Sequence, residues 1–257
     1  MKVVILCGGQ GTRLREETEY RPKPMVEIGG IPLLLHIMKM YSDQGHNEFI
    51  LCLGYKGEQI RDFFLNKHNN LTDVEIKIGK EKTEVKSFKN YMENWKITLA
   101  NTGLRAQTGA RIKKIEKYID DEDFLVTYGD GVSDVDINKV IELHKKEGNY
   151  VTLTGVHPRS KYGTMELKGN KIIKFMEKPV LKEYVNGGFY VFNKKAFDYL
   201  VKDDDCVLET YAFTKLAEVQ KIGMYNHDGF WFAVDTYKEY LDLNKLWDIG
   251  KKPWWKE

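Results

Sequence analysis

The chain has few cysteines, and none of them is closely paired in the sequence. Three occur in 257 residues, Cys7, Cys52 and Cys206, and no Cys-x-x-Cys spacing is present. Two of them stand inside apolar runs, which is typical of reduced, packed thiols in a protein of the cytoplasm. The six histidines lack metal-ligand spacing, so a zinc site is not expected.

An excess of either charge is also absent. Forty Lys and Arg residues stand against 38 Asp and Glu residues, which leaves a net charge of +2. This balance gives no electrostatic reason to expect nucleic acid or an anionic membrane as a partner. The longest apolar runs are far shorter than a bilayer span, and the N-terminus opens into a strand-like run instead of a signal sequence. We therefore expect a soluble, cytoplasmic protein.

Strand-like and helix-like segments alternate through the first half of the chain. This alternation predicts an α/β fold with a Rossmann-like, mostly parallel sheet flanked by helices. After Gly163 short strands precede further helices, which predicts a smaller mixed β/α part. The expected strands are 1–6, 49–53, 74–78, 95–99, 123–128, 150–155, 165–167, 172–175 and 189–192, and the expected helices are 31–43, 58–66, 111–118, 136–146, 196–200, 208–219 and 237–247.

No repeat, proline-rich linker or low-complexity tail divides the chain. We expect a single domain over 1–257, with an N-terminal half at about 1–155 and a C-terminal half at about 156–257. Residues 79–94 are polar and only weakly periodic. A long irregular insert of this kind is typical of a lid or an oligomer contact.

A glycine-rich loop follows the first apolar run. Gly8, Gly9 and Gly11 stand between the expected strand and Leu14, and they let backbone N–H groups approach an anion without an intervening Cβ atom. The loop fits neither the P-loop nor the dinucleotide-binding pattern. Arg13 and Lys23 add positive charge beside it, which would stabilise a polyphosphate leaving group. A tight strand-to-helix turn with solvated basic residues is the alternative.

Two aspartates follow strand-like runs. Asp130 lies between two glycines after the expected strand 123–128, and ligand groups in open α/β sheets gather at such strand ends. It is a candidate to hold Mg²⁺ against a phosphate, since Mg²⁺ prefers one or two carboxylates together with phosphate oxygens. Asp235 follows the apolar residues 232–234 and would supply the second carboxylate, or else act as the N-cap of the helix 237–247.

Longer motifs carry a family resemblance over nearly the whole chain. They are the loop with Arg13, residues 21–30 (Arg-Pro-Lys-Pro-Met-Val-Glu-Ile-Gly-Gly), 128–131 (Tyr-Gly-Asp-Gly), 177–179 (Glu-Lys-Pro), 186–189 (Asn-Gly-Gly-Phe) and the Trp-rich C-terminus. In this order they resemble the sugar nucleotidyltransferases, most closely the glucose-1-phosphate cytidylyltransferases, also called CDP-glucose pyrophosphorylases.

The resemblance implies a role for each motif residue. The catalytic residues would be Arg13 and Lys23, and the Mg²⁺ ligands Asp130 and Asp235. The N-terminal half would bind the nucleotide through Leu6, Gly8, Gly9, Gly11, Thr12, Thr108, Gly109 and Arg111, although Ala110 departs from the family's Thr-Gly-Gly-Arg. The C-terminal half would hold the acceptor, together with Tyr128, through Glu177, Lys178, Asn186 and Gly187. A strand-opening turn is the alternative for Asn186 and Gly187.

The reaction implied is the joining of CTP to a sugar 1-phosphate, with release of pyrophosphate. Glucose 1-phosphate is the leading acceptor, and a homo-oligomer is expected. Residues 208–213 (Leu-Glu-Thr-Tyr-Ala-Phe) and 232–234 depart from the family pattern, which keeps another sugar 1-phosphate, or a small polyol phosphate such as glycerol phosphate, open as acceptor. A catalytically idle nucleotide-sugar-binding regulatory subunit is the alternative of another class.

Overall fold

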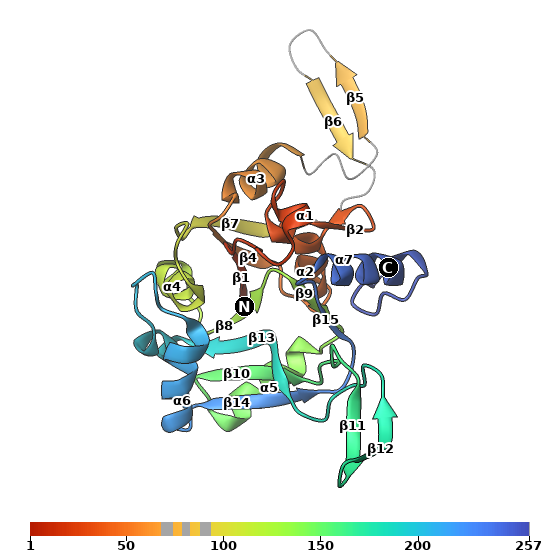
Figure 1. The fold of residues 1–257 in the computed structure, drawn as a ribbon. Coiled ribbons are helices and arrows are strands. Elements are labelled where there is room, and N and C mark those ends of the chain that lie inside the picture. The colour runs from red at the N-terminus through yellow and green to blue at the C-terminus, as the bar shows by residue number, and fades with distance from the viewer. Residues whose placement is uncertain (68–73, 79–82, 88–93, 257) are drawn as a thin grey trace.

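A seven-stranded sheet forms the centre of the computed structural model, which describes residues 1–67, 74–78, 83–87 and 94–256 (Figure 1). In sheet order its strands are Ile222–His227 (β14), Val151–Val156 (β10), Val185–Asn193 (β13), Asp123–Tyr128 (β8), Lys2–Cys7 (β1), Glu48–Leu53 (β4) and Lys96–Asn101 (β7). Strand β13 runs antiparallel to β10 and β8, and the other neighbouring pairs are parallel. The predicted mostly parallel sheet is confirmed.

Alternation along the strands divides the core into two layers. Val3 and Ile5 of β1 point to one face, and Val4 and Leu6 point to the other. The first face packs against α2 (Leu33–Ser42), α5 (Ile137–Glu147) and α7 (Tyr237–Asp248). The second packs against α4 (Thr108–Lys114), α6 (Thr214–Glu218), a 3₁₀ helix η5 (Lys194–Tyr199) and a π-helix η6 (Leu208–Phe213).

Shorter elements surround this sandwich. The helical ones are α1 (Arg15–Thr18), η1 (Lys23–Met25), α3 (Gly57–Asp62), η2 (Phe63–Lys67) and η4 (Glu116–Tyr118). The paired strands are β2 (Glu27–Ile28) with β3 (Ile31–Pro32), β5 (Val74–Ile78) with β6 (Thr83–Ser87), β9 (Gly131–Ser133) with β15 (Trp231–Ala233), and β11 (Thr164–Lys168) with β12 (Lys171–Met176). Hairpins β5–β6 and β11–β12 project from the body at different ends of the view (Figure 1).

The structure departs from the predicted elements in several places: the short elements α1, β2, β3, β9 and β15 were not predicted, and the helices expected over 111–118 and 208–219 are each divided into two. Strand β14 was not expected, because its residues are mostly half-exposed and include glycine, asparagine and histidine. The helix expected from 111 begins at Thr108. Within the insert expected to be irregular, residues 83–87 form a strand paired with β5, whereas residues 79–82 and 88–93 lie outside the described residues.

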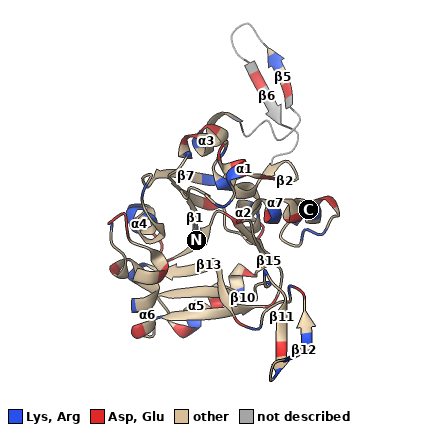
Figure 2. Cartoon of the chain, viewed as in Figure 1, with Lys and Arg blue, Asp and Glu red and all other residues tan. Residues whose placement is uncertain are grey.

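Charge is distributed without a large region of one sign. Figure 2 shows Lys and Arg interspersed with Asp and Glu on most elements, in agreement with the net charge of +2. Over the described part of the chain, none of the helices combines the length and the apolar character needed to span a bilayer.

The C-terminal tail docks on the first layer through His36. Trp254 Nε1 donates to His36 Nδ1 at 3.2 Å, so the proton of the imidazole is on Nε2, which donates to the Ile28 carbonyl at 2.9 Å. The rings of Trp247 and Trp255 lie 5.0 and 4.8 Å from the imidazole. Burial in this cage lowers the pKa of His36 to about 4. The fold therefore requires a neutral His36.

This cage predicts a pH dependence of stability. Between pH 6.5 and 4 the unfolded chain protonates His36 and the folded chain does not, so the free energy of unfolding falls as the pH falls through this window, by up to about 3 kcal/mol. Replacing His36→Gln keeps a donor and an acceptor but removes the titration. Urea unfolding at several pH values should give a shallower decline for this variant than for wild type or for His157→Gln, a partly exposed histidine outside the cage. Equal declines would contradict the assignment.

Candidate active site

A cavity of about 260 Å³ opens where the carboxyl ends of β1 and β8 meet. Parallel strands bring their carboxyl ends to one edge of the sheet, as the sequence reasoning assumed. All the lining residues except Asp235 come from the N-terminal half of the chain. They are Leu6, Cys7, Gly8, Gly9, Gly11, Thr12, Arg13, Lys23, Pro24, Ala106, Gln107, Thr108, Arg111, Tyr128, Gly129, Asp130 and Asp235.

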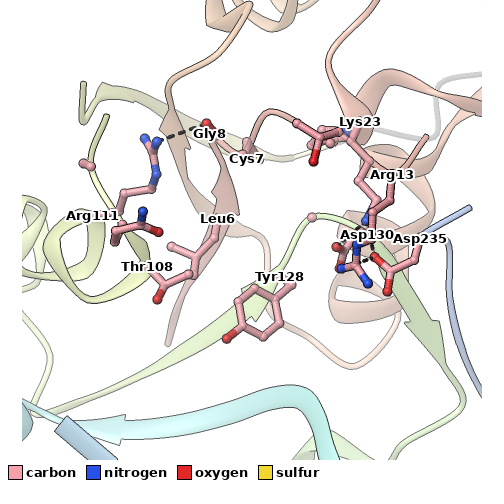
Figure 3. A pocket seen from close by; sticks show the side chains of 17 residues that line it. Leu6, Cys7, Gly8, Arg13, Lys23, Thr108, Arg111, Tyr128, Asp130 and Asp235 are labelled. Atoms are coloured by element: carbon pink, nitrogen blue, oxygen red, sulfur yellow. Dashed lines mark hydrogen bonds and ion pairs between the residues drawn. The ribbon is translucent and has the colours of Figure 1, made fainter. Parts of the chain in front are cut away.

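The side chains separate into two groups (Figure 3). Arg13, Lys23, Asp130 and Asp235 gather at one end of the cavity, and Thr108 and Arg111 lie at the other. Tyr128 lies between the two groups. One end therefore carries the charges expected for phosphate chemistry, while the other is built from α4 and the turn that precedes it.

The glycine-rich loop is shaped by two close approaches. Gly11 has φ +61°, a left-handed conformation that favours glycine, and a Cβ there would lie 2.7 Å from Thr18 Cγ2. A Cβ on Gly8 would lie 2.1 Å from Arg111 Nη1. The loop closes with the Leu14 N–H donating to the Gly11 carbonyl at 2.9 Å. Glycine is therefore needed here for the backbone path as well as for access to a phosphate.

Arg111 is almost fully buried, and its guanidinium joins three segments of backbone. Nη2 donates to the Gly8 carbonyl at 3.0 Å, and Nη1 donates to the Leu53 and Gly103 carbonyls at 3.1 and 2.9 Å and to Thr102 Oγ1 at 2.7 Å. Burial lowers its pKa from the ordinary value, but arginine keeps its charge throughout the working pH range. The residue predicted to bind nucleotide thus uses these donors to position the loop.

Lys23 is the centre of the charged group. Its Nζ donates to Asp130 Oδ2 at 2.8 Å and to Asp235 Oδ1 at 2.7 Å, and its side chain is only 11% exposed. Burial by itself would lower the pKa of Lys23, but the two carboxylates outweigh this effect and raise it. Burial opposes ionisation of Asp235 in the same way, and Lys23 with Arg13 lowers its pKa below the usual value. Lys23 and Asp235 are therefore both charged at neutral pH.

Strand pairing brings the two aspartates together. The two-stranded antiparallel sheet of β9 and β15 sets Gly131 opposite Ala233, and the Val234 N–H donates to the Asp130 carbonyl at 2.9 Å. Asp235 follows directly, and its Oδ1 lies 3.0 Å from Arg13 Nη2. The arginine side chain is 69% exposed and reaches over the cavity from outside.

The helix N-cap is the neighbouring Thr236, not Asp235. Thr236 Oγ1 accepts from the Glu239 N–H, and the Glu239 carboxylate accepts from the Thr236 N–H at 2.8 Å, which together form a capping box. Glu239 also accepts from the Asp235 N–H at 2.9 Å. The N-cap alternative for Asp235 is therefore wrong, and its carboxylate is free to face Lys23.

A second polar contact crosses the wall of the cavity. The Tyr128 hydroxyl donates to Glu209 Oε1, and Thr108 Oγ1 accepts from the Leu208 N–H at 2.9 Å and lies 3.4 Å from Glu209 Oε2. Burial raises the pKa of Tyr128 well above its usual value, so the phenol stays protonated. The segment 208–213, which departs from the family pattern, is thus joined to the cavity through its glutamate.

Five residues predicted for the site do not line the cavity. Gly109 packs against Cys206, whose Sγ would lie 2.8 Å from a Cβ at that position. Asn186 and Gly187 both lie in β13: Asn186 donates to the Tyr190 hydroxyl of the same strand at 2.7 Å, and the Gly187 carbonyl accepts from Trp231 Nε1 of β15 at 2.8 Å. Glu177 and Lys178 follow β12 and form an ion pair of 3.6 Å with one another. Lys178 has φ +47°, which is uncommon for a non-glycine residue.

Several neighbours of the site were not predicted from the sequence. Ala106 and Gln107 line the cavity but lie outside the motifs of the resemblance, and Pro24 lies in the motif 21–30 but was given no role. Lys161 lies 3.7 Å from Glu239 and contributes to the lowered pKa of Asp235, but it is one of 40 basic residues in the sequence. Cys7 also borders the cavity. Burial raises the pKa of its thiol, which argues against a thiolate nucleophile.

The donor set at the charged end fits a magnesium ion. Two carboxylates from different segments contact the same nitrogen, so their oxygens already converge on a single cationic position. Mg²⁺ is bound through one or two carboxylates, with phosphates and water completing its octahedron. In the part of the chain that the structure describes, no group of three or more His, Cys, Asp or Glu side chains could hold a metal ion. A site of this kind would need substrate oxygens.

Comparison with known proteins gives full-length relatives. The family model for nucleotidyl transferases matches residues 2–248. A probable glucose-1-phosphate cytidylyltransferase of Bacillus subtilis is 44% identical over 99% of both chains, and the glucose-1-phosphate cytidylyltransferase of Salmonella typhimurium is 43% identical over 99% of this chain and 98% of its own. A solved UDP-glucose pyrophosphorylase in complex with UDP-glucose shares the fold, with TM-score 0.70 and 20% identity over 97% of this chain and 98% of its own.

The contacts of Arg111 predict a structural cost for its loss. Arg111→Met leaves buried carbonyls without their donors, so urea unfolding should show a free energy lower by about 2–4 kcal/mol. Arg105→Met, at an exposed arginine of the preceding turn, should change it by less than about 0.5 kcal/mol. A variant of normal stability that no longer binds nucleotide would show instead that the guanidinium serves the nucleotide directly.

Proposed function

The chain belongs to the nucleotidyl transferase family, among the glucose-1-phosphate cytidylyltransferases, and we propose that it joins CTP to glucose 1-phosphate to give CDP-glucose and pyrophosphate. The observation that carries this proposal is the charged group of Arg13, Lys23, Asp130 and Asp235 beside a glycine-rich loop, in a chain that matches these relatives from end to end. A regulatory subunit would have little use for the complete charged set.

The reaction needs positioning and charge compensation more than proton transfer. An oxygen of the acceptor phosphate forms a bond to the α-phosphorus of CTP, and the bond from that phosphorus to the bridging oxygen breaks in line with it. The attacking oxygen is already ionised, so no general base is required. Negative charge grows on the departing pyrophosphate, where Arg13 and Lys23 supply fixed positive charge. The glycine-rich loop would offer its N–H groups to the phosphates.

Asp130 and Asp235 are the residues that would hold Mg²⁺. When bound, the ion supplies additional positive charge to the phosphate oxygens and helps to align them. The two carboxylates are 105 residues apart in the sequence (235 − 130), and the pairing of β9 with β15 keeps them adjacent.

Glucose 1-phosphate is favoured as acceptor over a polyol phosphate because the relatives at 43–44% identity bear that substrate in their names. Lys178, by resemblance, would meet the acceptor phosphate, with Glu177, Asn186 and Gly187 near the sugar. Asn186 bonds to Tyr190, whose ring lies 5.9 Å from that of Tyr128 at the cavity wall. This contact supports a sugar site on the C-terminal side of Tyr128.

We also propose a homo-oligomer in a reducing, cytoplasmic setting. Hairpin β11–β12 is amphipathic, and one of its faces carries the exposed side chains of Met165, Leu167, Ile172 and Phe175. A two-stranded hairpin with an uncovered apolar face is marginally stable in water, which supports a partner for it. The three buried, free cysteines fit a reducing compartment.

Pyrophosphate release should identify the substrates. A screen that crosses CTP, UTP, dTTP, ATP and GTP with glucose 1-phosphate, other sugar 1-phosphates and glycerol phosphate should give the highest kcat/KM for CTP with glucose 1-phosphate. A mismatched acceptor leaves buried polar groups unpaired at about 1–3 kcal/mol each, so we expect it to be at least roughly tenfold poorer. Efficient use of glycerol phosphate in preference to glucose 1-phosphate would overturn the acceptor assignment.

Arg13 and Lys178 should affect different kinetic constants. Arg13→Ala should lower kcat by about 10²-fold or more with a smaller change in the KM for CTP, because charge on the leaving group grows towards the transition state. Lys178→Ala should mainly raise the KM for the acceptor. Steady-state kinetics with each substrate varied would separate the two effects. If Lys178→Ala weakened CTP binding and left acceptor kinetics unchanged, the proposed division of the halves would be wrong.

A further inference from the structure

Lys23 occupies a rigid part of the backbone next to the two proposed metal ligands. It begins η1, it follows Pro22 with φ −66°, and Pro24 comes next. The Met25 N–H donates to the Pro22 carbonyl at 2.8 Å, and the Val26 N–H to the Lys23 carbonyl at 3.1 Å. Proline on both sides restricts the main chain. Any response to a ligand therefore falls to the side chain of Lys23.

The ammonium group contacts both carboxylates at once. Lys23 Nζ lies 2.8 Å from Asp130 Oδ2 and 2.7 Å from Asp235 Oδ1. A divalent cation that used the same two oxygens, at the shorter distances typical of Mg²⁺, would lie within a few ångströms of this nitrogen. Charges of the same sign that close repel strongly in a partly buried site. Lys23 and the cation thus compete for the same pair of oxygens.

We propose that Lys23 is a placeholder for the divalent cation: it holds Asp130 and Asp235 in their binding arrangement and opposes entry of the cation until the nucleotide triphosphate offers the ammonium group other anionic partners. This inference rests on the proposed function, because it takes these aspartates as the metal ligands. The proposal adds a coupling between the two ligands: the cation binds weakly by itself and tightly when the nucleotide is also bound. Nucleotide and cation then strengthen one another's binding by the same factor.

Lys23 could instead assist the cation, and that role predicts a change in cation affinity of the opposite sign when Lys23 is removed. If Lys23 merely oriented the two carboxylates for the cation, removing it would weaken cation binding in every state. If it is a placeholder, removing it strengthens binding of the cation alone, since the two facing carboxylates then keep only the largely exposed Arg13, at Asp235, as a counter-charge. The sign of the change in affinity therefore decides between the two roles.

The test measures Mn²⁺ affinity by electron paramagnetic resonance of the free ion, on the full chain without acceptor, in the absence and presence of CTP. Lys23→Met should bind Mn²⁺ without CTP about tenfold or more tightly than wild type, and the tightening caused by CTP should shrink. Lys23→Gln, which keeps an N–H donor but loses the charge, should behave in the same way. Lys39→Met removes a lysine that pairs with Asp43 at 2.7 Å and is of similar exposure, and it should match wild type. Unchanged or weaker binding without CTP in both Lys23 variants would overturn the proposal.

Two further measurements separate this inference from the function on which it rests. Asp130→Asn should weaken Mn²⁺ binding in the presence of CTP, and failure to do so would remove Asp130 from the metal site, whatever Lys23 does. The double variant Lys23→Met/Asp130→Asn should lose the gain of the single Lys23 variant. Thermal unfolding reports folding independently: Mn²⁺ should raise the Tm of Lys23→Met more than that of wild type. An equal rise would count against the placeholder.

Discussion

The guanidinium of Arg111 holds together the edge of the sheet on which the cavity is built. It accepts no bond and has donors to spare, so a single buried side chain ties the Gly8 carbonyl to those of Leu53 and Gly103. These carbonyls lie at or just after the carboxyl ends of β1, β4 and β7, where the chain leaves each strand in a separate loop. Gly8 and Gly54 leave the space that the guanidinium fills. The glycine-rich loop is thus held in one conformation by the hydrogen bond that Arg111 of α4 donates to the Gly8 carbonyl.

A balance of charge governs the other end of the cavity. Two carboxylates face a buried ammonium and a largely exposed guanidinium, and the opposite charges keep Lys23 protonated and Asp235 ionised. Burying such a cluster costs desolvation free energy, and clusters of this kind are typical of functional sites. The basic residues at the two ends of the cavity also differ in their partners. Arg111 donates to backbone carbonyls, whereas Lys23 and Arg13 contact carboxylates, which an anionic ligand can replace.

The sequence was sufficient for the sheet and for most of the helices, because β1, β4 and β8 are buried runs and α2, α5 and α7 have clear helical patterns. It was insufficient for β14, which is a half-exposed edge strand without strict alternation. In the site, the glycine loop and Asp130 could be predicted because they follow strands. The contacts of Lys23 could not be predicted, because its partners Asp130 and Asp235 lie 107 and 212 residues away in the chain. The role of Arg111 was hidden for a similar reason, because its acceptors are carbonyls that any residue possesses.

The attachment of Asp235 to the last helix has a consequence for synthesis of the protein. The Glu239 carboxylate accepts from the main-chain N–H of Asp235, and α7 is fixed to the turn between β2 and β3 through Asn244, which accepts from the Gly29 N–H at 2.9 Å. Beyond α7, Trp254 closes the cage around His36. A ribosome-bound chain that had already folded its glycine-rich loop would still lack one of the two carboxylates. The charged group at the cavity is therefore complete only once Asp235 has been synthesised, and a chain terminated before Asp235 would retain the glycine-rich loop without the full charged set.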